Sequence, residues 1–170
     1  MIVDEITMQR IDKLHPIIRE KTRNVYIYIN NYILGKYTRL RFSHTIRTDA
    51  EQDYLYAQGR TRPGVIVTNA KGGESEHNYA LAFDIVMLYD KDKNGTFETA
   101  SWDTLFDGDG DGVSDWLEVT KVLEKAGYKN GFIRNGKKWD KPHFSETFGY
   151  KPSQLKQLPK DSNGYVIFPN

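Results

Sequence analysis

The chain has 170 residues, and its 24 Lys and Arg against 23 Asp and Glu give a formal net charge of +1 at pH 7. This balance argues against a general nucleic-acid-binding protein, whose domain is usually strongly basic. The length fits one domain with its own hydrophobic core, so we expect residues 1–170 to form a single domain. Because the chain has no cysteine, disulfides, cysteine-zinc sites and a thiol nucleophile are excluded. Any metal site must therefore use His, Asp, Glu or carbonyl oxygens.

Hydropathy gives no sign of a membrane span or a secretion signal. The most apolar stretch, residues 25–34, contains two asparagines and is far shorter than the roughly 20 residues that a span needs. The first 11 residues carry charged side chains and lack the apolar segment of a signal peptide. We therefore expect no membrane span and synthesis in the cytoplasm.

The patterns in the first half of the chain predict an α+β fold, in which helices flank a small antiparallel sheet. Apolar residues at helical spacing predict an N-terminal helical third with a break near Pro16. A strand is predicted over residues 39–46, followed by a helix that Thr48 or Asp49 caps. The next elements along the chain are a long Gly-containing loop over residues 60–76 and a strand over residues 80–88.

An acidic insertion interrupts the second half of the chain. Residues 90–118 contain nine acidic and two basic side chains, a local charge of −7, which leaves +8 on the remaining residues. A helix is predicted from Trp116 to about Ala126, with Gly127 at its end. The remaining predicted elements are short strands around residues 132–133 and 143–144 and a final helix near residues 153–158.

Two of the four histidines have a metal-binding context. His77 ends the Gly-containing loop, seven residues before Asp84 on the predicted strand. Since seven is odd, both side chains reach one ion only if the chain bends between them. The second of these histidines, His143, follows Asp140 by three residues. We expect His44 to be structural. Two histidines and one aspartate leave a fourth position open, which is the arrangement of catalytic zinc.

These residues resemble a family of zinc peptidases. Ser75-x-His77 through Ala82-x-Asp84, followed by Asp140-x-x-His143, is similar to D-Ala-D-Ala carboxypeptidases, vancomycin-resistance dipeptidases and L-alanyl-D-glutamate endopeptidases. The family commonly has Gly where this chain has Ala80. The other matching segments are Ile46-Arg47-Thr48 with Gln52, Leu55-Tyr56, Gly59-Arg60-Thr61, Pro63-Gly64 and Trp139-Asp-Lys-Pro-His-Phe. The form of this last segment looks most like the L-Ala-D-Glu endopeptidases of phage endolysins and related autolysins.

The resemblance implies a role for each matching polar residue. Zinc held by the two histidines and the aspartate would lower the pKa of its bound water towards ~7. Asp140 would be the general base that takes the water proton and passes it to the leaving amine. Arg47 would bind a substrate carboxylate or stabilise the oxyanion. Ser75 and Gln52 are expected to contact the substrate or to support the residues that do.

Residues 107–118 match the twelve-residue calcium loop of an EF-hand, D-x-D-x-D-G-x5-E. A predicted helix follows this loop but none precedes it, so we expect an isolated EF-hand-like insertion. Residues 90–101 begin in the same way but end on Ser101 instead of an acidic residue. The predicted calcium ligands are Asp107, Asp109, Asp111, the carbonyl of Val113, Asp115 and Glu118.

The sequence therefore predicts a zinc-dependent peptidoglycan hydrolase, a phage endolysin that cleaves the L-Ala-D-Glu bond of stem peptides. We expect a monomer that calcium regulates by ordering the insertion, and that reaches the cell wall once the membrane is permeabilised. The positive charge outside the insertion suits an anionic cell wall. Two alternatives stay open: a D-Ala-D-Ala carboxypeptidase with the same ligands, and a non-catalytic zinc- and calcium-binding recognition module.

Overall fold

A computed structural model describes residues 1–131, 133–134, 137–138 and 140–169. It combines helices with a small antiparallel sheet, as the sequence predicts. The elements in chain order are α1 (Glu5–Ile11), α2 (Pro16–Tyr28), the π-helical turn η1 (Ile29–Ile33), β1 (Thr38–His44), α3 (Asp49–Ala57), the 3-10 turn η2 (Glu76–Tyr79), β2 (Ala82–Tyr89), β3 (Thr99–Ser101), α4 (Asp115–Lys125), β4 (Lys129–Asn130), β5 (Ile133–Arg134), β6 (Lys137–Lys138), β7 (His143–Ser145) and α5 (Pro152–Leu155).

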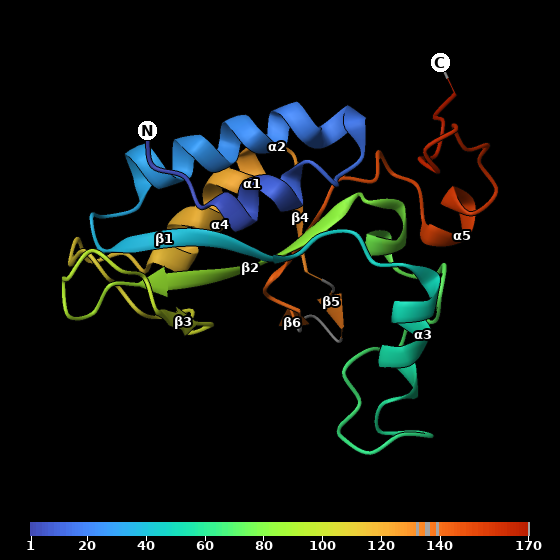
Figure 1. Ribbon diagram of the computed structural model, residues 1–170, viewed down its shortest axis with the longest axis horizontal. Coiled ribbons are helices and arrows are strands. Elements are labelled where there is room, and N and C mark those ends of the chain that lie inside the picture. Colours follow the sequence, from blue (N-terminus) through green and yellow to red (C-terminus); the bar gives the residue numbers. More distant parts are fainter. Residues whose placement is uncertain (132, 135–136, 139, 170) are drawn as a thin grey trace.

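The sheet has five strands. Four of them lie in the order β1-β2-β7-β4, and the fifth, β3, pairs with β2 beyond the end of β7. In Figure 1, α1, α2 and α4 lie together on one side of this sheet. The helix α3 and the loop after it project away from the sheet, and α5 lies close to the C-terminus. The short β5 and β6 form a separate two-stranded ribbon. The long central strand β2 is thus the element around which the other strands assemble.

The helix starts follow the chemistry of their first residues. Asp4 caps α1, and Pro16 opens α2 at a position where its missing N–H is no loss. The predicted break near Pro16 is therefore the start of a second helix. Thr48 and Glu51 form a capping box at the start of α3, which confirms the predicted cap.

A stack of three fully buried aromatic rings ties the central strands together. Phe42 on β1 stacks on Phe83 of β2 at 4.2 Å between ring centroids, and Phe83 stacks on Phe144 of β7 at 6.0 Å. Successive residues of a strand point to opposite faces, so the residues next to these rings point away from the aromatic core. Two of those neighbours are Asp84 and His143, which are paired across the sheet.

Several short elements differ from the prediction. The three-residue β3 was not predicted, because its Thr-Ala-Ser sequence has no alternating apolar pattern. The final helix spans only Pro152–Leu155, shorter than the predicted 153–158 and starting at a proline. Of the strand predicted around residues 132–133, Phe132 lies outside the described residues, and so does Trp139. Among the described residues, we find no helix with the length and apolarity needed to span a membrane.

Candidate metal centre and active site

Three donor atoms from three different elements converge at one point. The Nε2 atom of His77 lies 3.2 Å from the Oδ1 atom of Asp84, and both lie 3.2 Å from the Nδ1 atom of His143. Zinc binds such donors at about 2.0–2.1 Å, so in a tetrahedral site two ligand atoms are about 3.3–3.4 Å apart. The triangle therefore has the dimensions of one face of a zinc tetrahedron, and its fourth corner faces a pocket.

A tight turn brings His77 and Asp84 to the same side of the chain. His77 sits in the 3-10 turn η2, which Ala80 closes in the left-handed conformation with φ of +57° and ψ of +28°. The predicted bend between the two ligands is thereby confirmed. A left-handed backbone favours glycine, because a Cβ atom crowds the neighbouring carbonyl. This preference explains why similar peptidases commonly have Gly where this chain has Ala80.

Hydrogen bonds on the far side of each imidazole assign its tautomer. His77 Nδ1 lies 2.5 Å from the carbonyl oxygen of Thr45, and His143 Nε2 lies 2.9 Å from Oε2 of Glu76. A neutral imidazole donates from one nitrogen and accepts with the other. Because the outer nitrogens donate to these oxygens, the inner ones present lone pairs to the centre. Two lone pairs and a carboxylate oxygen at 3.2 Å repel one another without a cation, so the donor set fits zinc.

The electrostatics of the centre also favour a bound cation. Burial opposes the charge on Asp84, but His77 and His143 hold the pKa of its carboxyl far below the ordinary value. Burial alone would lower the pKa of His143, yet its hydrogen bonds with Asp84 and Glu76 raise that pKa to about 9. Both shifts show a site that stabilises positive charge. A proton can supply this charge in the metal-free protein, and a divalent metal supplies it without needing protons.

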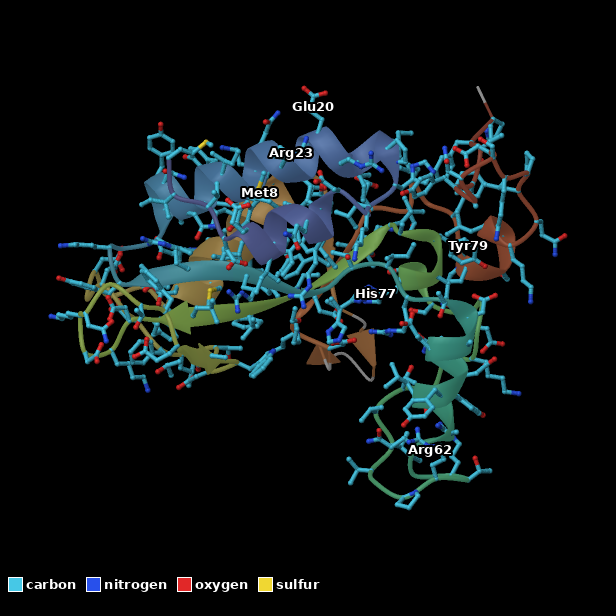
Figure 2. All side chains as sticks on the ribbon, in the orientation of Figure 1. Met8, Glu20, Arg23, Arg62, His77 and Tyr79 are labelled. Carbon is cyan, nitrogen blue, oxygen red and sulfur yellow. The ribbon has the colours of Figure 1, made fainter. Side chains whose placement is uncertain are left out.

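The centre opens into a cavity of about 600 Å³. Figure 2 shows His77 between the sheet and α3, with Arg62 near the tip of the projecting segment. The walls come from the end of β1, from α3 and its loop, and from the metal centre itself. The residues that line it include His44, Arg47, Leu55, Gln58, Val67, Thr68, Asn69, Ala70, Glu74, Ser75, His77, Asp84, Asp140 and His143.

Of the other candidate residues, Asp140, Arg47 and Ser75 line the cavity. Burial, and then the negative charge of Asp84, raise the pKa of Asp140 above its ordinary value. Arg47 is mostly buried, with its Nη2 atom 3.8 Å from Oδ2 of Asp84. Its Nη1 atom donates to Oε1 of Gln52 at 2.8 Å. The pocket thus pairs one half-buried carboxyl with one anchored cation beside the metal centre.

Gln52 and Ser75 have supporting positions. Gln52 is fully buried, and its amide nitrogen donates to the carbonyl of Ala70 at 2.8 Å while its oxygen holds Arg47. It therefore lies behind Arg47 and does not face the cavity. Ser75 lines the cavity, and its hydroxyl accepts from the backbone N–H of His77 at the start of η2.

Two residues near the centre were not assigned a role from the sequence. His44, which we expect to be structural, is exposed, lines the cavity and is the strand partner of Asp84. Glu76 contacts His143 across 67 positions of the chain. In the sequence, Glu76 is noticeable only because it lies between Ser75 and His77. This position does not indicate that its partner is His143.

With this geometry established, the chain can be compared with known proteins. No family model matches the chain. The chain is 39% identical over 118 residues to the peptidoglycan L-alanyl-D-glutamate endopeptidase CwlK of Bacillus subtilis strain 168, covering 69% of this chain and 65% of CwlK. The resemblance found in the motifs is thereby confirmed. The chain is similar to an L-alanyl-D-glutamate endopeptidase. It spans just under two thirds of the length of CwlK.

A solved structure supports the same fold. The L-Ala D-Glu endopeptidase ChiX of Serratia marcescens has a TM-score of 0.50 with this chain, over 84% of this chain and 87% of ChiX. The two are 17% identical in sequence, so this likeness concerns the fold alone. The mixed α and β architecture around a small antiparallel sheet is therefore one that an L-Ala D-Glu endopeptidase is known to adopt.

The acidic loop at residues 107–118 is held by its own backbone. Asp107 accepts hydrogen bonds from the N–H groups of Gly110 and Gly112 at 2.7 and 2.9 Å. Gly112 has φ of +92°, as the sharp turn of such a loop requires. The carboxylate oxygens of Asp107, Asp109 and Asp115 lie within 4.8 Å of one another. Three of the six predicted ligands therefore lie close together, and local hydrogen bonds hold Asp107 in place.

Two carboxylate oxygens of this loop are unsatisfied. The Oδ1 atom of Asp115 and the Oε2 atom of Glu118 are buried and have no hydrogen-bond partner among the described residues. Burial, followed by the charges of the loop aspartates, raises the pKa of Glu118 to about 7. Oxygen ligands of this kind suit calcium, which takes six to eight of them. A second acidic group, formed by Asp90, Asp92 and Glu98, lies in the preceding stretch, where both oxygens of Asp90 already accept backbone hydrogen bonds.

The insertion touches the segment that carries the metal ligand His143. Lys141 Nζ donates to Oγ1 of Thr104 at 3.1 Å, and the carbonyl of Pro142 accepts from the N–H of Ile85 on β2 at 3.0 Å. Thr104, Lys141 and Pro142 also share a small cavity with Trp102 and Trp116. A change in the insertion therefore has a direct route of contact to the residues between Asp140 and His143.

Proposed function

We propose that the protein is a zinc-dependent peptidoglycan hydrolase that cleaves the L-Ala-D-Glu bond of cell-wall stem peptides. The observation that carries the proposal is the 3.2 Å triangle of His77, Asp84 and His143 donor atoms at the base of a cavity. The names of CwlK and ChiX, which both state an L-Ala-D-Glu endopeptidase activity, support the choice of bond. Both lines of support point to the same chemistry.

In this proposal, the two histidines and Asp84 hold Zn²⁺, which when bound polarises the scissile carbonyl and makes its water acidic. Asp140 takes the proton of the attacking water and returns it to the leaving amine. A general base works best when its pKa lies close to the working pH, and the burial of Asp140 moves its pKa in that direction. Its place beside the ligands in the cavity wall suits this task.

Arg47 is proposed to hold a carboxylate of the stem peptide or the oxyanion that forms on the attacked carbonyl. A guanidinium presents its donors in a planar fork, which matches either group. Gln52 fixes this fork from behind, since it is buried and bonded to both Arg47 and Ala70. Ser75 lines the same cavity and is proposed to contact the substrate.

We further propose that residues 107–118 bind Ca²⁺ and that this binding regulates the enzyme. The buried, unpartnered oxygen of Glu118 and the gathered aspartates support a cation at this loop. Ordering the loop would act on the metal centre through Thr104 and Lys141, which are hydrogen bonded. The proposed ligands are those predicted from the sequence: Asp107, Asp109, Asp111, the Val113 carbonyl, Asp115 and Glu118.

The biological setting that we propose is a phage endolysin, acting as a monomer on the bacterial cell wall after the membrane is permeabilised. Support comes from the motif that ends at Phe144, whose form resembles that of phage endolysins; its Trp139 lies outside the described residues. The charge of +8 outside the acidic insertion suits an anionic polymer as substrate.

Product analysis tests the proposal. The protein, loaded with zinc and calcium, is incubated with purified stem peptides, the products are mapped by mass spectrometry, and metal content is counted per chain. We expect products that end in L-Ala or begin with D-Glu, and one zinc per chain. Release of D-Ala instead would identify a carboxypeptidase, and bound zinc without any product would identify a non-catalytic recognition module.

A further inference from the structure

Glu76 is the polar residue near the metal centre whose position the proposed chemistry leaves unexplained. Its side chain is only 14% exposed, and its Oε2 atom lies 2.9 Å from Nε2 of His143. It immediately precedes His77 in the short turn η2. Placing a carboxylate in such a buried position is costly unless it is paired and hydrogen bonded, and here its partner is the outer nitrogen of a metal ligand.

We propose that Glu76 is a positioning residue, which fixes the ring of His143 in the tautomer that presents Nδ1 to the metal. The imidazole N–H at Nε2 donates to the Glu76 carboxylate, so the lone pair at Nδ1 faces His77 and Asp84. Outer partners of this kind orient a ligand and raise its basicity, and their loss typically costs 10- to 100-fold in metal affinity.

The two histidines are positioned by partners of different kinds. His77 is held by a backbone carbonyl, that of Thr45, which no side-chain substitution removes. His143 is held by a side chain, and that side chain belongs to the turn that also supplies His77. One short turn thus contributes a ligand directly and orients the ligand opposite to it. Displacing η2 would therefore disturb both imidazoles at once.

The experiment compares zinc affinity in four proteins: wild type, Glu76→Ala, Glu76→Gln and Glu20→Ala. Glu20 is a matched control, since this exposed glutamate projects from α2 away from the centre (Figure 2). Competition with a chromophoric chelator gives the zinc dissociation constant. We expect Glu76→Ala to bind zinc 10- to 100-fold more weakly, Glu76→Gln to recover part of this loss through its remaining acceptor oxygen, and Glu20→Ala to match wild type.

A second measurement separates positioning from a general effect on folding. NMR of the imidazole nitrogens reports the tautomer of His143 in the zinc-free proteins at a pH where the ring is neutral. We expect one tautomer, protonated at Nε2, in wild type and in Glu76→Gln, and a mixture in Glu76→Ala. If Glu76→Ala kept the single tautomer and bound zinc within twofold of wild type, the inference would be overturned.

The inference rests on the proposed zinc site, but not on which peptide bond is cut. Both measurements are made without substrate, so they stand whether or not stem peptides are hydrolysed. A wild-type protein that binds no zinc would overturn the proposed function together with the inference. If the wild type and Glu76→Ala bound zinc with the same affinity, the inference would be overturned and the proposed function would not.

Discussion

The two ends of β2 carry polar clusters that are assembled in opposite ways. At one end, Asp84 meets His77 and His143, so the cluster draws on three elements, and the two histidines are 66 positions apart in the chain. At the other end, the strand runs into the acidic insertion, whose loop takes all its carboxylates from residues 107–118. In Figure 1 the insertion loops and η2 lie at opposite ends of the strand.

The difference lies in what holds each cluster in place. At the end of β2 with the proposed zinc site, called the zinc end below, the imidazoles are hydrogen bonded to Thr45 and Glu76, which the tertiary fold brings to them. The aspartates of the acidic loop are held by neighbouring backbone N–H groups, for example Gly112 on Asp107. The zinc end therefore depends on the packing of distant segments, whereas the acidic end depends on hydrogen bonds within its own loop.

The largest effect is expected when the proposed general base at the zinc end is removed and the zinc is kept. Asp140→Ala should lower kcat on stem peptides by about 10²- to 10⁴-fold, the usual contribution of a general base. Zinc content should stay at one per chain, because Asp140 is not among the three converging ligands. Steady-state kinetics and metal analysis check both points. Asp12→Ala, an exposed aspartate on the other side of the sheet, serves as the control and should keep full activity.

The next effect should arise at the acidic end alone. Calcium at 100 times its dissociation constant should stabilise the wild-type protein by about 2.7 kcal/mol, or roughly 5–10 °C in Tm for a domain of this size. The double variant Asp109→Ala with Glu118→Ala should lose this shift and the calcium dependence of activity, yet still bind zinc. Asp103→Ala, in the insertion but outside the loop, should behave as wild type. Calcium-dependent activity that persists in the double variant would contradict regulation through the loop.

A substitution at Ala80 tests how far the zinc end depends on one backbone turn. Ala80→Val should lower the free energy of unfolding by about 2 kcal/mol, because a β-branched residue resists the left-handed conformation and the site is fully enclosed. Ala80→Gly should change it by less than about 1 kcal/mol, since relief at positive φ is offset by greater freedom in the unfolded chain. Denaturant unfolding measures both values. Equal stability of the two variants would show that the turn is not restrictive.

The smallest effect is expected on stability, and it arises at His15, which lies at neither end of β2. Buried His15 caps α2 by accepting the N–H of Ile17 at Nδ1, and its Nε2 pairs with the carbonyl of Val166. Burial is the main cause that lowers the pKa of His15 below its ordinary 6.5. The unfolded chain therefore takes up the proton more readily, and stability should fall as the pH drops below about 6.5. The loss should be about 1 kcal/mol, the usual value of an N-cap.

The variant His15→Asn provides the comparison for this pH effect. Asn is a good N-cap that does not titrate, so the difference in unfolding free energy between wild type and variant should shrink towards low pH. Urea unfolding at several pH values, with zinc absent throughout, gives this difference. A constant difference from pH 8 to pH 5 would show that His15 does not titrate in the folding transition.

The features that the sequence predicted are mainly those that depend on residues close together in the chain. The acidic loop could be proposed as a cation site because its residues are consecutive and their spacing matches that of a known calcium loop. The proposed zinc ligands required the motifs as well, and the need for a bend between His77 and Asp84 followed from strand parity alone. Thr48 as a cap and the break at Pro16 were predictable, since both depend on neighbouring residues.

The sequence alone did not predict the positions of residues that depend on contacts between distant segments. The contact of Glu76 with His143 depends on how η2 packs against β7, and the exposure of His44 depends on its register with Asp84. The position of Gln52 behind Arg47 likewise needs the path of the loop that carries Ala70. No local pattern encodes these distances, because each joins segments whose separation in space is fixed by other parts of the core.

The aromatic stack also limits where the chain can gain or lose residues during evolution. Phe83 and Phe144 lie one position away from Asp84 and His143, so a single deletion or insertion within either strand would turn the ligand towards the core and a phenyl ring towards solvent. Length changes in β2 and β7 should therefore be absent from active homologues. The loops between Tyr89 and β3 and between β3 and α4 carry no such register, so changes in their length should be tolerated better.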